Sequence, residues 1–474
     1  MCRLAACATL FLVCACNPGG NEEADTERPR HLLLITLDTQ RADHLGCYGG
    51  GADLTPNLDQ LAAAGVRFSR AFTAIPATLG SHGTLLTGRY PLAHGMTDNF
   101  HPLPEKVETL GAVLGARGFR TAMFFHLFPF HQARIARQFE TAELDNSLRA
   151  DGLVAALKSW LLPAARADRP LFCWIHLFIP HAPLDPPEPF LARFVRTRYE
   201  GPLTDKFDVL ESIRQGRIEA PPDYIENLKE RYRAEVAFTD HRVGEILAAW
   251  QQSGLRAETL VIVCADHGES YERGAFALHA PIIRDSTLQV PLLMAGPGLP
   301  AGTVVDSVVE LVDVHPTILE LLDVGKDSDG QGQSLVPLIE GRREGWSDVA
   351  FAMLPTTFYA LDGDRVSPRS LQDMSGMTAS AREGSWKLVM TGAHRELFDV
   401  AADPGELRDI AAQHPERVER MARSIEQWTQ SCLMLHPGLE GSFDERTRQL
   451  LEEMGYVDPS ADPPKSQPDR KNGR

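Results

Sequence analysis

Acidic and imidazole side chains come directly after several apolar segments of this sequence, where they could bind a metal ion. Asp38 follows the apolar run at 31–37, and Asp266 and His267 follow the run at 259–265. If these runs are neighbouring parallel strands, their carboxyl ends meet at one edge of a sheet. Oxygen and nitrogen donors held there suit a divalent cation. An aspartate alone could instead bond its own loop backbone, but the joint placement predicts a metal site.

Four further histidines lie near the same strand ends. His126 follows one apolar run, His176 lies within another, and His181 comes shortly after it. We interpret His126 and His176 as packed residues that support the ligands, and His181, in the extended and proline-flanked segment PHAPLDPP, as a better exposed residue. His279 is another candidate ligand or substrate contact, although a loop histidine without a role fits the sequence equally well.

The stretch PATLGSHGTLLTGRYP, residues 76–91, offers a candidate nucleophile. A helix that starts here would present free backbone N–H groups that attract anions. The hydroxyl of Thr78, beside a divalent cation, could then ionise and attack a phosphorus or sulfur centre. The local sequence alone favours Thr78 as a helix cap, whereas its expected position beside Asp38 and Asp266 favours it as the nucleophile.

The apolar runs that carry these residues alternate with helical patterns. They read HLLLITL, RTAMFF, PLFCWIHLF, TLVIVCA and VPLLMAG, at 31–37, 120–125, 170–178, 259–265 and 290–296. Strands that are apolar throughout and separated by helices are typical of a parallel sheet covered on both faces. One helix is expected after Thr55 as N-cap, with Pro56 first and Gly65 ending it, and a long one over 224–253. We therefore expect an α/β fold with a large mixed, mostly parallel sheet sandwiched by helices.

The chain divides into five segments by composition. We expect a signal peptide of the lipoprotein type over 1–16, a polar linker over 17–30, a catalytic domain over 31–340, a smaller C-terminal α+β subdomain over 341–456, with a helix near 414–431, and a disordered tail over 457–474. The motif VCAC places Cys16 where a lipid would be attached, although a plain signal peptide has similar features. The protein is therefore expected to be exported and anchored to the cell envelope, periplasmic or at the surface, or else secreted.

Charge and cysteine content exclude some classes of protein. The formal net charge of -17 argues against a nucleic-acid partner, because such partners need clustered Lys and Arg. Any anionic substrate must therefore meet a local cationic site, most simply a metal. The cysteines beyond the leader are widely scattered, which indicates no disulfide scaffold; they are Cys47, Cys173, Cys264 and Cys432.

Several of these segments occur in an order that resembles the sulfatase family of the alkaline phosphatase superfamily. They include HLLLITLDTQRADHLGCYGG, TPNLDQLAAAGVRFSRAFT, GTLLTGRYPLAHGMTDN, TLVIVCADHGES and ELFDVAADPGE, and the similarity runs from about residue 30 to about 412. The resemblance implies the fold of that superfamily and a metal-dependent hydrolase. It places Asp38, Asp266 and His267 at metal-ligand positions and Thr78 at the nucleophile position. His82 takes the place of an arginine of the signature, and His181 that of a substrate-contacting histidine.

The sequence departs from the family pattern at three places. The family signature is Cys or Ser, any residue, Pro, Ser, Arg, and its first residue is oxidised to formylglycine; here residues 78–82 read TLGSH. Thr39 stands where many sulfatases have a second ligating Asp, and the Lys-containing motif is absent, with only His126 nearby. Threonine as nucleophile resembles the phosphodiesterase branch of the superfamily, which uses two zinc ions. Asp240 with His241 lacks that branch's second-site spacing, although His279 could supply a ligand.

One main hypothesis and two alternatives follow. The main hypothesis is a metal-dependent hydrolase of sulfate or phosphate esters with Thr78 in place of formylglycine. His82, His181 and His279 would hold the anion or protonate the leaving group with ordinary pKa values near ~6.5. The alternatives are a phosphodiesterase or phosphoryl-linked group transferase of the same superfamily, and a catalytically degenerate binding lipoprotein.

The sequence leaves the metal and the substrate open. The divalent metal could be Ca, Zn, Mn or Mg. The expected partner is a small anionic ester, or a sulfated or phosphorylated glycan or lipid. A membrane would be contacted only through the lipid on Cys16.

Overall fold

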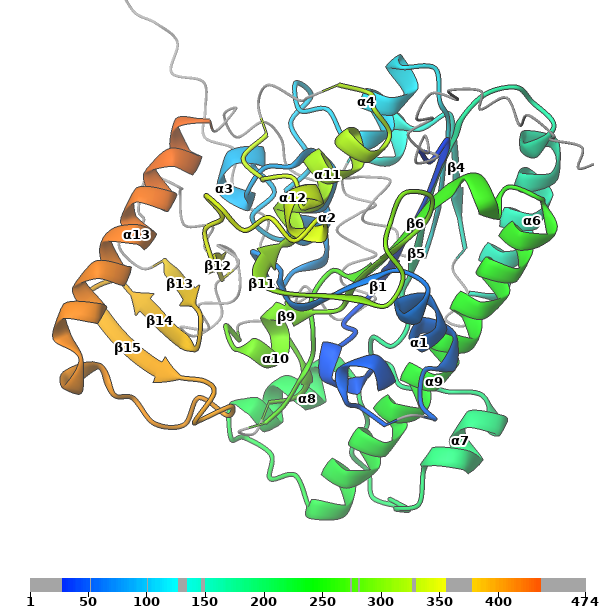
Figure 1. Cartoon of the computed structure of the whole chain (residues 1–474). Coiled ribbons are helices and arrows are strands. Elements are labelled where there is room, and N and C mark those ends of the chain that lie inside the picture. The colour runs from blue at the N-terminus through cyan, green and yellow to red at the C-terminus, as the bar shows by residue number, and fades with distance from the viewer. Residues whose placement is uncertain are drawn as a thin grey trace, which may run out of the picture.

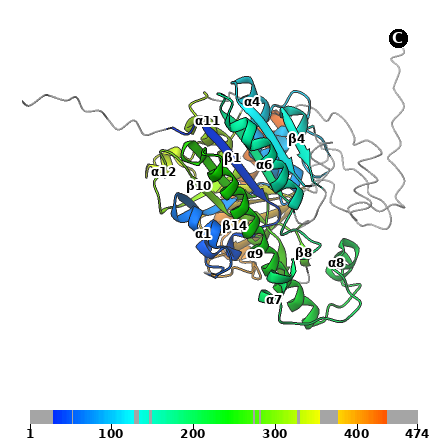
Figure 2. The ribbon, with the colours of Figure 1, turned by 90° about the vertical axis from the view of Figure 1, so that its right-hand side faces the viewer.

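A central sheet with helices on both sides forms the main body of the protein (Figures 1 and 2). The computed structural model describes residues 28–51, 53–99, 101–126, 134–145, 150–272, 275–279, 282–325, 330–354 and 377–435. The expected signal peptide with Cys16, most of the linker and the expected tail lie outside these ranges. Within them, no helix combines the length and apolar content needed to cross a membrane.

The main sheet places β1 at its centre. Its order is β11 (Thr303–Glu310), β2 (Val66–Phe72), β10 (Leu292–Ala295), β6 (Thr259–Ala265), β1 (His31–Leu37), β5 (Leu171–Leu177), β3 (Arg120–Phe125) and β4 (Thr141–Leu144), and β9 (Gln289–Val290) pairs with β2. β1 runs parallel to both neighbours, with Leu37 opposite Leu177 on β5 and Ala265 on β6. The residues that follow β1 and β6 are therefore side by side at one edge.

The expected fold class is confirmed, with one strand direction corrected. Four of the five expected strands lie within parallel pairs, but β10 runs antiparallel to β6. The chain between β6 and β10 forms the small hairpin β7 (Ser270–Glu272) and β8 (Ala275–Leu278) and the short helix α10 (Asp285–Leu288). These elements return the chain from the edge where β6 ends, without the crossover helix that a parallel strand needs. β2, VRFSRAF, was not among the expected strands because polar residues interrupt its apolar pattern.

The helices form two groups around the sheet. Figures 1 and 2 show α1 (Pro56–Ala63), α6 (Asp151–Ala165) and α9 (Pro222–Gln252) along one side. Figure 1 shows α2 (Thr78–Thr87), α11 (Val314–Leu321) and α12 (Val336–Ile339) on the opposite side of β1. The shorter helices α3 (Pro91–His94), α4 (Leu110–Ala116), α7 (Glu188–Phe194) and α8 (Phe207–Arg214) complete the described set.

The helix expected after Thr55 is present, but Thr55 and Gly65 have other roles at its ends than the sequence predicted. Thr55 occupies the N-cap position without capping the helix through its side chain. Its hydroxyl instead accepts a hydrogen bond from the Gly46 amide at 2.8 Å and lies 3.1 Å from Asp59. Gly65 follows the helix in an ordinary backbone conformation, and a Cβ there would lie 2.1 Å from the carbonyl oxygen of Met294. The glycine is therefore required by close packing against β10.

The C-terminal part is an antiparallel sheet covered by one helix. Strands β12 (Val349–Met353), β13 (Thr378–Glu383), β14 (Trp386–Thr391) and β15 (His394–Asp399) pair in sequence order, and α13 (Pro415–Met434) packs on them. Buried apolar residues of α13 join side chains of the sheet and of α3 in one cluster. A small α+β unit thus docks on the main body, as expected, while the expected boundary near 340 stays a prediction.

Candidate active site

Asp38, Asp266 and His267 come together at the ends of β1 and β6, as the register requires. All three are fully buried, and one ligand atom from each lies within 4.8 Å of the others. Asp266 Oδ1 accepts hydrogen bonds from the amides of Thr39 at 3.2 Å and His267 at 2.7 Å. Three carboxylate oxygens accept no hydrogen bond from the described residues: Oδ1 and Oδ2 of Asp38 and Oδ2 of Asp266. Buried carboxylate oxygens without donors suit a site that holds a cation.

The orientation of His267 supports this interpretation. In the neutral ring, Nδ1 donates to the carbonyl oxygen of Gly268 at 3.0 Å, which leaves Nε2 as the acceptor. Nε2 lies 3.6 Å from Asp266 Oδ2, 4.0 Å from Asp38 Oδ1 and 3.5 Å from the Thr78 hydroxyl. Ligands at about 2.0–2.3 Å from one ion are separated by about 3 to 4 Å. Asp38, Asp266 and His267 therefore have ligand atoms close to the spacing that a single divalent cation needs, and the Thr78 hydroxyl lies beside them.

The pKa values of Asp38, Asp266 and His267 are shifted because the three side chains are buried next to one another. Burial raises the pKa of Asp38 and of Asp266, because loss of water penalises the charged carboxylate, and their mutual repulsion adds to the effect on Asp266. Burial works to lower the pKa of His267, but attraction to the two aspartates outweighs it and the pKa is raised. A bound cation would supply the missing solvation and keep both carboxylates charged.

Thr78 is the first residue of α2, and its hydroxyl faces this cluster. The N-cap residue is Ala77, so the alternative interpretation of Thr78 as the cap does not match the structure. The start of α2 is fixed on two sides: the amide of Leu79 donates to Asn99 Oδ1 at 2.9 Å, and the hydroxyl of Ser81 donates to the carbonyl oxygen of Asp266 at 2.6 Å. Thr78 is buried to within 2% of its surface. The hydroxyl is therefore held rigidly at a helix N-terminus, where negative charge is stabilised.

His82 lies one turn further along α2, behind Thr78. Its Nδ1 donates to the carbonyl oxygen of Thr78 at 2.7 Å, and its Nε2 lies 3.1 Å from the hydroxyl of Thr36. Burial lowers the pKa of His82 to about 3, so the ring is neutral at physiological pH. His82 is placed to orient Thr78, and its expected contact with the substrate anion stays a prediction.

The Thr36 hydroxyl is the centre of a buried network on β1 and β5. It lies 2.9 Å from Trp174 Nε1, 3.0 Å from His176 Nδ1 and 3.1 Å from His82 Nε2. A hydroxyl has one proton and two lone pairs. Trp174 can only donate, and His82 must accept because its other nitrogen donates to Thr78, so His176 Nδ1 donates. The Nε2 of His176, 3.4 Å from Asp38 Oδ2, is then the unprotonated nitrogen.

His181 and His279 complete a row of imidazole rings that ends at His267. The ring centres of His181 and His279 are 5.3 Å apart, and those of His279 and His267 are 4.4 Å apart. Burial lowers the pKa of His181 to about 4 and that of His279 well below its ordinary value. The assumption that these histidines titrate near neutral pH is thus corrected. A neutral imidazole ring donates one hydrogen bond and accepts another.

Glu269 is a site residue that the sequence analysis missed. It is buried, and its Oε2 lies 3.5 Å from Nδ1 of His279 while its Oε1 accepts from the amide of Ser270 at 3.0 Å. Burial raises its pKa to about 8. Its place two residues after His267 was the available signal. The network centred on Thr36 had a weaker signal, a single polar residue inside the apolar run HLLLITL.

Three other residues of the sequence analysis have structural roles. Thr39 uses its backbone amide toward Asp266 and adopts a φ of 56°, a strained conformation for a β-branched residue. His126 packs its ring against Phe178 at 4.6 Å. Asp240 lies on α9 and accepts from the amide of Leu58 at 2.8 Å.

The sequence profile of the family described as Sulfatase matches residues 30–324, more than half of the chain. The chain belongs to the sulfatase family. A second profile, for the C-terminal part of N-sulphoglucosamine sulphohydrolase, matches residues 279–431. Together with the relatives that follow, this membership indicates a hydrolase of sulfate or phosphate-type esters.

Individual relatives extend the similarity over most of the chain. An arylsulfatase of Clostridium perfringens is 23% identical and covers 83% of this chain and 93% of its own. Arylsulfatase K of Bos taurus is 26% identical over 86% of this chain and 83% of its own.

Solved structures share the fold. The phosphonate monoester hydrolase of Agrobacterium radiobacter has a TM-score of 0.71 at 22% identity and covers 86% of this chain and 96% of its own. A protein solved with its substrate D-glucosamine-2-N,6-O-disulfate has a TM-score of 0.69 at 18% identity, with 87% and 99% covered.

Proposed function

We propose that this sulfatase-family protein hydrolyses sulfate or phosphate esters with Thr78 as the nucleophile. The observation that supports this best is the convergence of the Thr78 hydroxyl with Asp38, Asp266 and His267 Nε2 around a space suited to one cation. A divalent metal bound there would lower the pKa of the threonine hydroxyl and neutralise charge on the reacting group.

The chain's own residues then position the reaction. Thr78 Oγ1 forms a bond to the sulfur or phosphorus atom while the bond to the leaving alkoxide breaks, and the proton of the Thr78 hydroxyl passes through water to the alkoxide. A second water attacks the same atom, releases the inorganic anion and restores the hydroxyl. The N-terminus of α2 stabilises the developing negative charge, and His82 holds the Thr78 carbonyl so that the hydroxyl keeps its direction. His181 and His279 bind oxygens of the ester as neutral rings.

The position of Thr78 favours a hydrolase over a degenerate binding protein. A buried hydroxyl at the start of a helix, 3.5 Å from a candidate ligand nitrogen, is placed for reaction with a bound ester. The absence of Cys or Ser at residue 78 means that the formylglycine route does not apply. Transfer to a hydroxyl acceptor instead of water uses the same first step and stays an alternative.

Substitution of Thr78 tests this function. We expect Thr78→Ala to reduce turnover of aryl sulfate, phosphate monoester or phosphodiester substrates by at least about 10³-fold, because the nucleophile is removed. Thr78→Ser, which keeps the hydroxyl, should retain measurable turnover, and the metal content of both variants should match the parent protein. Acid-quenched protein should carry a phosphoryl or sulfuryl adduct on the peptide that contains residue 78. Full activity in Thr78→Ala would overturn the assignment.

We also propose a sulfated or phosphorylated glycan as substrate and export with a lipid on Cys16. The first is supported by the relative that was solved with a disulfated glucosamine, and the second by the VCAC motif. Radiolabelled palmitate incorporated into the parent but not into Cys16→Ala would support the anchor, and equal labelling would overturn it.

A further inference from the structure

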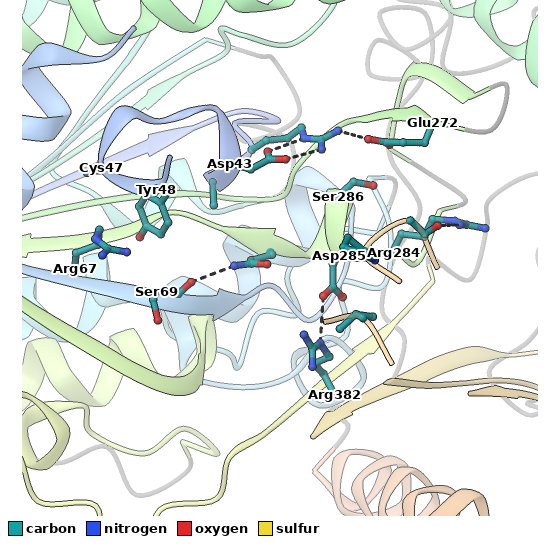
Figure 3. A pocket seen from close by; sticks show the side chains of 16 residues that line it. Asp43, Cys47, Tyr48, Arg67, Ser69, Glu272, Arg284, Asp285, Ser286 and Arg382 are labelled. Atoms are coloured by element: carbon teal, nitrogen blue, oxygen red, sulfur yellow. Dashed lines mark hydrogen bonds and ion pairs between the residues drawn. The ribbon is translucent and has the colours of Figure 1, made fainter. Parts of the chain in front are cut away.

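A polar cavity of about 640 Å³ lies between the main body and the C-terminal sheet, apart from the residues of the reaction site. Figure 3 shows its walls, which come from the segment after β1, from β2, from the start of α10 and from β13. A second cavity of about 380 Å³ shares Glu272 and Arg284 with it. The first cavity has the volume of a ligand site, and its mainly charged and polar walls suit a hydrophilic ligand.

Most charges in these walls are already paired. Arg41 binds Asp43 and Glu272, each at 2.8 Å, and Arg382 binds Asp285 at 3.1 Å (Figure 3). Paired side chains of this kind still offer donors and acceptors at their outer edges, as the hydroxyl groups of a sugar require.

Arg67 is different. It lies on β2, with strands paired on both sides, and its guanidinium stacks over the ring of Tyr48 at 5.0 Å. Within the described ranges, no carboxylate lies within ion-pair distance of Arg67. A half-buried guanidinium without a carboxylate partner keeps donors available for a bound anion. The guanidinium group of an arginine can donate two parallel hydrogen bonds to one sulfate or phosphate group.

Other polar groups surround this cation. Ser69, two residues along the same strand, and Gln289 on β9 line the cavity next to it, and the Gln289 amide donates to the Ser69 carbonyl at 3.1 Å. The buried hydroxyl of Ser286 lacks a hydrogen-bond partner among the described residues. The wall thus combines one surplus cation with hydroxyl and amide groups.

We infer that this cavity binds a saccharide that carries a sulfate or phosphate group, with Arg67 as the anion-binding residue. Arg41 connects the cavity to the reaction site. It lines the cavity, comes three residues after Asp38 and donates to the carbonyl oxygen of Glu269 at 3.1 Å. The inference extends the proposed substrate class to a second binding site, but the binding itself does not depend on the proposed hydrolysis.

Calorimetric titration of Thr78→Ala protein tests the site without turnover. The probes are N-acetylglucosamine 6-sulfate, N-acetylglucosamine 6-phosphate and neutral N-acetylglucosamine. We expect the charged sugars to bind to the Thr78→Ala protein. Introducing Arg67→Gln into that protein should weaken their binding about tenfold and leave any binding of the neutral sugar unchanged. The stronger of the two charged sugars identifies which anion the cavity prefers. Arg70→Gln is the matched control, because Arg70 lies on the same strand but outside the cavity.

Two outcomes would overturn the inference. One is no saturable binding of either charged sugar, and the other is equal affinity in the Arg67→Gln and Arg70→Gln proteins when both unfold at the parent's temperature. Arg67→Gln made in the active protein should keep its turnover of a small aryl ester. Binding of the charged sugars that does not depend on Arg67, in a protein that turns over the aryl ester, therefore counts against the cavity alone. Absent turnover in the parent protein, with Arg67-dependent binding present, counts against the proposed hydrolysis alone.

Discussion

The hydroxyl of Thr36 offers the sharpest test of how the nucleophile is supported. Thr36→Val keeps the shape of the side chain but removes the hydroxyl. Trp174 Nε1 and His176 Nδ1 then lose their acceptor, and His82 Nε2 loses its donor. Each buried polar group that loses its partner costs about 1–3 kcal/mol, so for three groups the free energy of unfolding should fall by about 3–9 kcal/mol.

The matched control is Thr36→Ser, which keeps the hydroxyl and removes one methyl group. Its cost should be about 1 kcal/mol. Urea unfolding of the parent and both variants measures the difference, and kcat for an aryl ester measures the effect on Thr78. Because His82 orients the Thr78 carbonyl through this network, we expect Thr36→Val to lower kcat while KM changes little. Equal stability and equal kcat in the two variants would refute the network as a support of the nucleophile.

Two further predictions concern stability. Burial raises the pKa of Asp313 to about 7, so the folded state binds this proton more tightly, and the contribution of this one group to the free energy of unfolding should fall by about 4 kcal/mol as pH rises from about 4 to about 7. Asp313→Asn should flatten that slope in urea titrations, and an unchanged slope would contradict the assignment. The buried Lys387 lies 3.0 Å from both Asp285 and Glu406, so Lys387→Met should cost about 3–5 kcal/mol at pH 7, because Glu406 loses this cation and Asp285 keeps its ion pair with Arg382. Calorimetric unfolding checks this, and an unchanged melting temperature would show that the cluster adds nothing to stability.

The sequence predicts the centre of the fold better than its margins. β1, β3 and β6 lie where the apolar runs place them, because strands buried on both faces are apolar throughout. The same pattern did not predict β2, because Arg67 and Ser69 on this strand line a polar cavity and interrupt its apolar sequence. The direction of β10 depends on how the hairpin after β6 returns the chain, which no hydrophobic pattern encodes.

The sequence predicted the candidate metal ligands, but not the buried residues that hold them and the nucleophile in place. Asp38, Asp266 and His267 could be placed together because parallel neighbours fix where strand ends meet. The protonation states of His181 and His279 follow from burial, which depends on the packing of distant segments. The role of Thr36 likewise depends on three nitrogens that only the tertiary structure brings together.

The place of His82 limits how this enzyme could be re-engineered. Installing Cys and Arg at residues 78 and 82, to imitate the formylglycine signature, would put a long guanidinium where a neutral ring now fits between Thr36 and the Thr78 carbonyl. The ring also packs 5.3 Å from Trp174 and 4.6 Å from His176. A change of catalytic chemistry would therefore need coordinated substitutions on β1, β5 and α2.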